Sequence, residues 1–403
     1  MTIASEITRL QTAKSDIKAA INWTWLIVPD SEKIDEYYKY IQKLTYIDTR
    51  TFTISWTEKP DMSSWWTYSD DAAWLTAWDT AFDEFFWYYW VRLSKAWVET
   101  NKVKQSTPGT LDITQLWTLT SWDDVMIAFP KMWYKMSKSW STVTLSLTKD
   151  PDKASEWYRY YAFTKWSDIK NVMYLWAYEM NSNYGSLSWA APKASQTRAQ
   201  FRSGVASVYN DSWRHSLITY RVRDFIKMLY MMKYGNPDSQ TVIWKWLTWW
   251  RAVENTWATN SITSATWATD TSKTWRIKLF WLEDIWWNVN EWMDCCYFNS
   301  STHLTVDNTN SIFQDSAYST DLWQASSWWL AGIDWSTEWT FRNISTSWWS
   351  STAYYCDSYS AYADCVLYVG GGYNYGNNAG MFFVIYDTVD YSNARIGSRL
   401  QFL

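Results

Sequence analysis

The last 54 residues of the chain carry side chains suited to non-covalent recognition. Tyrosine supplies a large rigid contact area at low entropic cost, and Asn, Ser and Asp supply adaptable hydrogen bonds, as in antibody binding sites. Interleaving of the two kinds predicts a ligand-binding face, with an ordinary polar sheet edge as the alternative. The tyrosines are Tyr354, Tyr355, Tyr359, Tyr362, Tyr368, Tyr373, Tyr375, Tyr386 and Tyr391, and the polar residues among them are Asp357, Ser358, Asn374, Asn377, Asn378, Asp387 and Asn393.

Few residues could carry covalent or metal-centred catalysis. His215 and His303 are the only histidines, which argues against a His-based triad or a His-rich metal site. The four cysteines are too few and too late in the chain for a disulfide framework, although Cys356 and Cys365 could form a bridge in an oxidising setting. The sequence therefore predicts a protein that is not an enzyme. By oxygen count alone, a calcium site is conceivable at Glu283, Asp284, Glu291 and Asp294.

The segment from Lys278 to Asp294 resembles the signature G-L/I-x-D-x-W-G-N-V-x-E-W, provided that positions 281 and 287 are glycine. That signature belongs to the formylglycine-generating-enzyme type of C-type lectin fold. The resemblance implies an α+β protein with a C-type lectin-like domain at the C-terminus, and acids that hold a loop core rather than calcium. The structural residues it implies are Glu283, Asp284, Trp286, Asn288, Glu291 and Trp292.

Enzymes of this fold use cysteines, so an oxidase-like enzyme is a third interpretation. Cys295 and Cys296 follow the motif directly instead of lying in the C-terminal core, where a catalytic pair is expected. Cys356 and Cys365 lie in a region expected to vary. Because a fold does not by itself carry a function, the resemblance is used for the fold and not for catalysis.

The composition contains 37 Trp and only 11 Gly, whereas average usage of about 7% would give roughly 28 Gly. All the tryptophans precede Ser350, and six of the glycines follow it. Many tryptophans stand in short polar clusters such as Ser139-Trp140-Ser141, which are turn signals that favour glycine. We therefore hypothesise that the gene uses UGA as a glycine codon and that many tryptophans of the translated sequence are glycines in the protein. The alternative, a genuine Trp-laden surface, would be an aggregation liability.

The segment from Leu367 to Leu400 looks like the C-terminal cassette of variable proteins diversified by retroelements, many of them carried by phages. The stretch from Thr197 to Gln240 also looks like those phage proteins. Such retroelements mutate adenines, so a UGA glycine codon in the cassette would mutate to a codon for another residue. Glycines that the fold needs must therefore be encoded there by GGN codons. That expectation matches the change in composition near residue 350. Mutation of this kind is also a possible origin of Cys356 and Cys365.

The resemblance divides the cassette, about residues 350–403, into scaffold and displayed positions. The expected scaffold, set by tight turns and core closure, is Gly370, Gly371, Gly376, Gly380, Gly397 and Arg399. The expected displayed residues are Tyr373, Asn374, Tyr375, Asn377, Asn378, Phe383, Ile385, Asp387, Val389, Tyr391, Asn393 and Arg395, and the predicted binding face adds Tyr354, Tyr355, Asp357 and Tyr359.

The 403 residues suffice for several domains. We expect a helical oligomerisation or attachment segment over residues 1–45, a small β-rich spacer over 46–116, and a ligand-binding domain over 117–403. Strands are predicted at residues 124–129, 142–147, 158–163 and 172–175. Helices are predicted at 201–208, behind a capping box at Thr197 and Gln200, and at 220–234, ending at Gly235.

These features predict a retroelement-diversified binding protein, at a phage tail-fibre tip or on a cell surface, that recognises a protein or glycan of a host or neighbouring cell. The runner-up is a carbohydrate-binding or adhesive surface module of fixed specificity. A homo-oligomer, guessed to be a trimer from fibre architecture, would gain avidity. The net charge of −5 without a basic stripe argues against nucleic acid, and the sequence shows neither an apolar membrane span nor a signal peptide.

Overall fold

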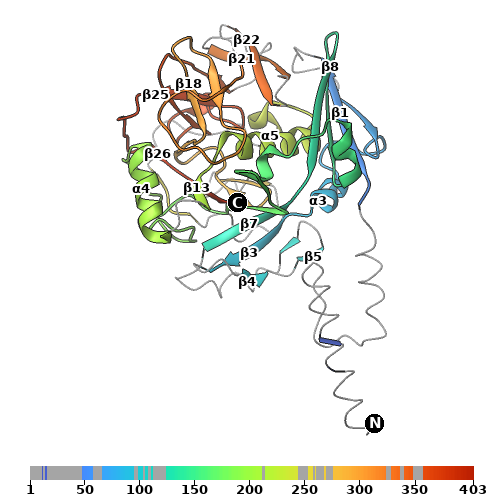
Figure 1. The fold of residues 1–403 in the computed structure, drawn as a ribbon, viewed down its shortest axis with the longest axis horizontal. Coiled ribbons are helices and arrows are strands. Elements are labelled where there is room, and N and C mark those ends of the chain that lie inside the picture. Colours follow the sequence, from blue (N-terminus) through green and yellow to red (C-terminus); the bar gives the residue numbers. More distant parts are fainter. Residues whose placement is uncertain are drawn as a thin grey trace.

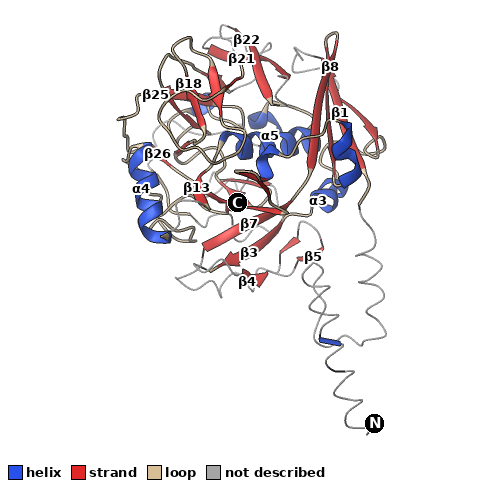
Figure 2. Ribbon diagram, in the orientation of Figure 1, coloured by secondary structure: helices blue, strands red, loops and turns tan. Residues whose placement is uncertain are grey.

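The computed structural model describes residues 11, 14–15, 48–57, 66–94, 99–102, 105–107, 110–111, 124–210, 214–243, 253–256, 259, 267–268, 276–323, 328–335, 340–347 and 357–403. The chain is a mixed α+β protein made mostly of sheets with few helices (Figure 2). The predicted helices of residues 1–45 lie outside the described residues, except for three positions. Among the described residues, no helix is long and apolar enough to cross a membrane.

Three larger sheets organise the fold, and Figure 1 shows α5 in the middle of the molecule. The four-stranded sheet has the order β2 (Thr67–Asp70), β1 (Thr51–Thr57), β9 (Thr142–Thr148), β8 (Trp133–Ser139). The six-stranded sheet has the order β13 (His215–Leu217), β27 (Leu400–Phe402), β12 (Val172–Trp176), β7 (Asp124–Pro130), β3 (Tyr89–Leu93), β4 (Glu99–Lys102). The seven-stranded sheet has the order β22 (Phe341–Ser347), β21 (Trp328–Trp335), β23 (Ser358–Tyr359), β25 (Val384–Asp387), β24 (Val366–Val369), β17 (Asn290–Trp292), β26 (Ile396–Gly397).

Smaller sheets and short helices complete the described architecture. The small sheets are β14 (Trp267–Ala268) with β15 (Ile277–Leu279) and β16 (Leu282–Glu283), β18 (Cys296–Phe298) with β19 (Leu304–Val306) and β20 (Thr320–Asp321), β10 (Thr164–Lys165) with β11 (Asp168–Ile169), and β5 (Gln105–Thr107) with β6 (Thr110–Leu111). The helices are α3 (Thr80–Phe86), α4 (Arg198–Tyr209), α5 (Tyr220–Tyr234), α6 (Ser239–Val242), η3 (Pro151–Glu156), η4 (Tyr161–Phe163) and η5 (Gly376–Asn378).

Both longer helices form where the sequence predicts: α5 has the predicted bounds, and α4 extends beyond the predicted 201–208 at both ends. Thr197 and Gln200 form a reciprocal capping box at the start of α4. Helix α5 starts after the cap Thr219 and ends at Gly235, whose φ of 59° closes the helix in the left-handed conformation. All fifteen residues of α5 are buried, so this helix forms the centre of the core rather than its surface.

Three of the four predicted strands are confirmed as β7, β9 and β12. The prediction of a strand over residues 158–163 is wrong, because the structure places a single bridge at Arg159 and the 3₁₀ helix η4 there. Ala162 and Phe163 are consecutive and both fully buried, a pattern that a strand with one solvent face cannot produce.

The expected spacer of residues 46–116 shares its sheets with later parts of the chain. β1 pairs with β9 over seven residues, and β3 pairs with β7. At the other end of the sequence, β27 joins β12 and β13. The expected boundary near residue 116 therefore does not coincide with a division between sheets.

Candidate functional site

The cassette strands are assembled around the motif strand. β17 pairs with β24 on one side and with β26 on the other, so a strand from before the cassette lies between two strands of it. β24 pairs in turn with β25. Because directly opposite residues share a face, this register places Tyr368 beside Ile385 and Val366 beside Asp387 on one face of the sheet.

A cluster of polar and aromatic side chains covers this face; we call Tyr368, Tyr375, Asp387, Tyr391, Asn393 and Arg395 the tyrosine cluster. The Tyr368 hydroxyl lies close enough to Tyr375 and to Asp387 to shift the pKa of each. Asn393 Nδ2 donates to Tyr391 Oη at 3.0 Å, and Arg395 Nε donates to Asn393 Oδ1 at 3.1 Å. Burial raises the pKa of Asp387 above its ordinary value, although the Thr388 N–H, which donates to its carboxylate at 3.1 Å, and the nearby Tyr368 hydroxyl oppose that shift. The cluster can bind a ligand through hydroxyl, carboxylate and guanidinium groups in fixed positions.

Most predicted displayed residues are accessible where the structure describes them. Asn374 and Val389 are exposed, and the residues that are partly exposed are Tyr373, Tyr375, Asn378, Ile385, Asp387, Tyr391, Asn393 and Arg395. Asn377 contributes its backbone to η5. Tyr354 and Tyr355 lie outside the described residues.

The prediction of a displayed side chain is wrong for three residues, because the structure buries them. Asp357 is fully buried, and its carboxylate accepts the Phe382 N–H at 2.5 Å. Tyr359 is buried with its ring edge-on to Phe298, and Phe383 lies buried beneath the Tyr375 ring, with 5.0 Å between ring centroids. Alternation along the chain does not reveal that other elements cover these positions.

Helix α5 supplies the cations that face Asp357, and Asp238 before α6 adds a like charge. Burial raises the pKa of the Asp357 carboxyl, while Lys227 and Arg223 oppose that shift. Lys227 is also buried, and burial lowers its pKa from 10.5 to about 8 despite the nearby carboxylates of Asp224 and Asp357. The core beneath the cassette therefore holds opposed ionisable groups among its apolar side chains.

We expect Lys227→Met to remove a pH dependence of stability. The folded pKa of Lys227, about 8, lies below its unfolded value of 10.5, so the unfolded chain binds more protons between these values. Wild-type stability relative to K227M should therefore rise with pH from about 8 towards 10.5, by at most about 1.4 kcal/mol per pH unit. Urea unfolding of both proteins at several pH values measures this difference, and a constant difference would contradict the assignment.

The motif acids are paired with arginines. Arg276 lies 2.7 Å from Asp284 and 3.4 Å from Glu283, and Arg399 Nε donates to Glu291 Oε1 at 2.7 Å. Asp294 is bound by Arg202, which holds the pKa of that carboxyl below its ordinary value against the effect of burial. No group of three or more His, Cys, Asp or Glu in the described part of the chain is arranged to hold a metal.

The other motif residues bind neighbouring segments. Asn288 Oδ1 accepts the Glu254 N–H at 3.0 Å, and its Nδ2 donates to Glu179. Trp292 is fully buried and donates its indole N–H to the Gln196 carbonyl at 3.0 Å. Trp286 is also buried, and a Cβ on Gly370 would approach its Cα to 3.3 Å.

Two cassette glycines are required by close approach. Gly371 has a φ of 83°, and a Cβ there would lie 2.5 Å from the Cβ of Ala379. A Cβ on Gly397 would lie 2.7 Å from Val289 and 2.8 Å from the Lys193 carbonyl. These positions have the scaffold character that the sequence predicts, as does the fully buried Arg399.

Tryptophan occurs repeatedly at backbone conformations that favour glycine. Nine of the twenty described non-glycine residues with positive φ are tryptophans. Trp281 (φ 67°) and Trp287 (φ 94°) are among them, whereas Trp286 and Trp292 are not. This division is the one that the motif requires. The other seven are Trp78, Trp87, Trp140, Trp157, Trp166, Trp189 and Trp323.

Trp140 occupies such a glycine-favouring backbone conformation in a hairpin. Ser139 pairs with Thr142, so Trp140 and Ser141 form a two-residue turn between β8 and β9. Trp140 has a φ of 57° and stands at the first central position, where a type II′ turn takes glycine. Its side chain is 96% exposed. Trp249 and Trp348, in similar polar clusters, lie outside the described residues.

The described cysteines are buried thiols. Cys295 and Cys296 are fully buried, and burial raises the pKa of Cys296 to about 12. The thiolate is the nucleophile in cysteine chemistry, and burial disfavours it here. Cys365 is a free thiol, and Cys356 lies outside the described residues.

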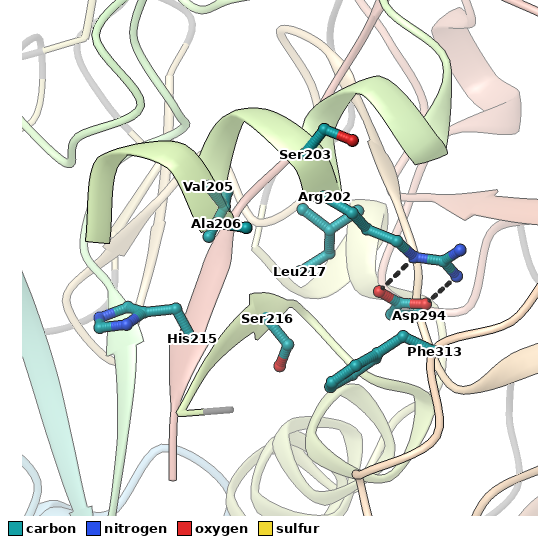
Figure 3. A pocket seen from close by; sticks show the side chains of 9 residues that line it. All are labelled: Arg202, Ser203, Val205, Ala206, His215, Ser216, Leu217, Asp294 and Phe313. Atoms are coloured by element: carbon teal, nitrogen blue, oxygen red, sulfur yellow. Dashed lines mark hydrogen bonds and ion pairs between the residues drawn. The ribbon is translucent and has the colours of Figure 1, made fainter. Parts of the chain in front are cut away.

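A cavity of about 240 Å³ beneath α4 was not predicted from the sequence. Figure 3 shows the Arg202–Asp294 ion pair at one end and His215 at the other. Burial lowers the pKa of His215 to about 2, so the ring is neutral at physiological pH. The lining residues come from segments before the cassette, with α4 and β13 as the main walls.

The sequence also missed the residues that hold the cassette backbone. Gln240 and Ser239 of α6 and Asn290 of β17 all donate or accept hydrogen bonds at main-chain atoms of the cassette. The turn Asn236-Pro237-Asp238 before α6 was the available signal, because a capped turn fixes the residues that follow it. Comparison with protein-family models and with curated proteins gives no match.

Proposed function

We propose that this chain is a binding protein whose C-terminal cassette is diversified by a retroelement, with a C-type lectin fold as its framework. It recognises a protein or glycan on the surface of a host or neighbouring cell, from a phage tail-fibre tip or a cell surface. The observation that carries the proposal is the tyrosine cluster, which is formed by cassette strands β24 and β25 and the loops beside them, around a motif strand from before the cassette.

The chemistry of the accessible residues supports recognition without catalysis. Tyr375, Tyr391 and Asp387 provide aromatic contact area together with hydrogen-bonding groups on one face. Behind them, Gly371, Gly397 and Arg399 occupy positions that tolerate no larger or uncharged side chain. Diversification requires this arrangement, in which the surface side chains can vary while the residues that support their backbone stay constant.

Sequencing of the cassette in sibling genes and in a population carrying this gene tests the proposal. We expect variation at adenine-containing codons of accessible residues such as Asn374, Tyr375 and Asn393, beside a reverse transcriptase gene. Asp357, Tyr359 and Phe383 should stay constant or change conservatively, because they are buried. An invariant cassette would contradict the proposal and favour the adhesive module of fixed specificity.

A further inference from the structure

Gln240 lies at the start of α6, outside the cassette, and reaches the loop that carries the displayed residues. Its Nε2 donates to the Gly376 carbonyl at 3.1 Å and also to the Ala379 carbonyl. The neighbouring Ser239 Oγ accepts the Met381 N–H at 2.9 Å. Gln240 is 4% exposed, and its Oε1 has no hydrogen-bond partner among the described residues, so its amide nitrogen makes the polar contacts seen here.

All these contacts are made to main-chain atoms of residues 371–381, which we call the display loop. Other anchors of the loop have the same character: Tyr373 N–H donates to the Asn288 carbonyl, and Trp287 N–H donates to the Gly371 carbonyl. Main-chain groups are the same whatever side chain the residue carries. Contacts of this kind therefore hold the loop without restricting the side chains of residues 373–375, 377 and 378.

The hydrogen bonds from Gln240 also stabilise the display loop, because part of its backbone is buried. Ala379 and Gly380 are buried, and Gly371 packs against Ala379 so closely that a Cβ would not fit. A buried carbonyl that loses its donor retains the full cost of its desolvation. The Gln240 amide donates to two carbonyls at once. Its loss would leave the buried Ala379 carbonyl without this donor, whereas the part-buried Gly376 carbonyl would keep the Ala379 N–H.

We propose that Gln240 is a positioning residue that fixes the backbone of the display loop, so that the side chains at positions 373–375, 377 and 378 can be exchanged without changing the shape of the loop. This inference deepens the proposed function and rests on it for its biological meaning. The physical claim concerns the loop alone.

Amide hydrogen exchange of the full chain, followed by mass spectrometry, tests the proposal. Gln240→Met removes the donor while preserving length, and we expect exchange of the Asn378, Ala379 and Gly380 amides to become about tenfold faster or more. Peptides from α5 and β24 should be unchanged. Gln240→Glu should have the same effect, and Q240M alone decides if Q240E does not fold.

Two controls make the result specific. Gln314→Met removes a similar amide, which donates to the Ser316 and Ala317 carbonyls away from the cassette, and should leave the display loop unchanged. The double variant N374S/N378S changes side chains only and should also leave its exchange unchanged. Unaltered loop exchange in Q240M, or equal acceleration in N374S/N378S, would overturn the proposal.

Failure of this inference and failure of the proposed function give different results. Hydrogen exchange requires no ligand and no sibling sequence. An invariant cassette together with accelerated exchange in Q240M would refute diversification but keep the role of Gln240. Variation in the cassette together with unaltered exchange in Q240M would support diversification but refute the role of Gln240.

Discussion

Replacing Trp140 by glycine is expected to stabilise the protein by about 1 kcal/mol. A left-handed conformation costs a residue with a Cβ roughly 1–2 kcal/mol, part of which is offset because glycine makes the unfolded chain more flexible. The Trp140 side chain is 96% exposed, so its removal leaves no cavity. Glycine at all seven accessible positive-φ tryptophans should raise the free energy of unfolding by about 5 kcal/mol, since distant sites add.

Trp74 is the matched control for this series. Its side chain is 92% exposed, but its backbone is not among those with positive φ. W74G therefore removes a similarly exposed indole without relieving backbone strain. The free energy of unfolding of W74G should equal that of the wild type or be lower. Chemical denaturation of W140G, W74G and the sevenfold variant measures the three values. Equal effects of W140G and W74G would show that indole exposure, not backbone conformation, is responsible.

The second large effect is expected from Arg399→Met, which should destabilise the protein by about 3–5 kcal/mol. Arg399 is fully buried, and its guanidinium donates to Glu291 at 2.7 Å, to the Trp176 carbonyl at 2.6 Å and to the Glu283 carbonyl. Its removal leaves a buried carboxylate whose nearest remaining cation, Arg223, lies 3.8 Å away. Two carbonyls lose their donors as well.

Arg395 provides the comparison within the same cassette. It is partly exposed, and within the described part of the chain its side chain is hydrogen-bonded to Asn393, so R395M should change stability by about 0.5 kcal/mol or less. The double variant E291M/R399M should recover part of the loss, because it removes the unpaired charge. Urea unfolding measures all three proteins. A loss in R395M as large as in R399M would contradict the division into scaffold and displayed positions.

Sequence patterns predicted the elements whose determinants are local. Helices α4 and α5 were located because a capping box and a C-terminal glycine act within a few residues. The positive φ at Trp140, Trp281 and Trp287 was also predictable, because turn chemistry is local. The motif acids were expected to hold a loop core, and each of Asp284, Glu291 and Asp294 has an arginine partner.

The rest depended on contacts between distant segments. The sequence could not show that α5 would cover Asp357, or that Tyr359 would face Phe298, since those neighbours are far away in the chain. It also could not show that β1 would pair with β9 across almost a hundred residues. Gln240 was missed for the same reason, because its partners Gly376 and Ala379 follow it by about 140 residues.

The fold on which the proposed function rests requires glycine at positions 281 and 287, and peptide mass spectrometry of the protein from the cells that carry its gene tests this directly. The account predicts glycine at both positions and tryptophan at 286 and 292, in agreement with their backbone conformations. Tryptophan at 281 and 287 would break the motif and remove the basis for the lectin-type fold and for the diversified binding face.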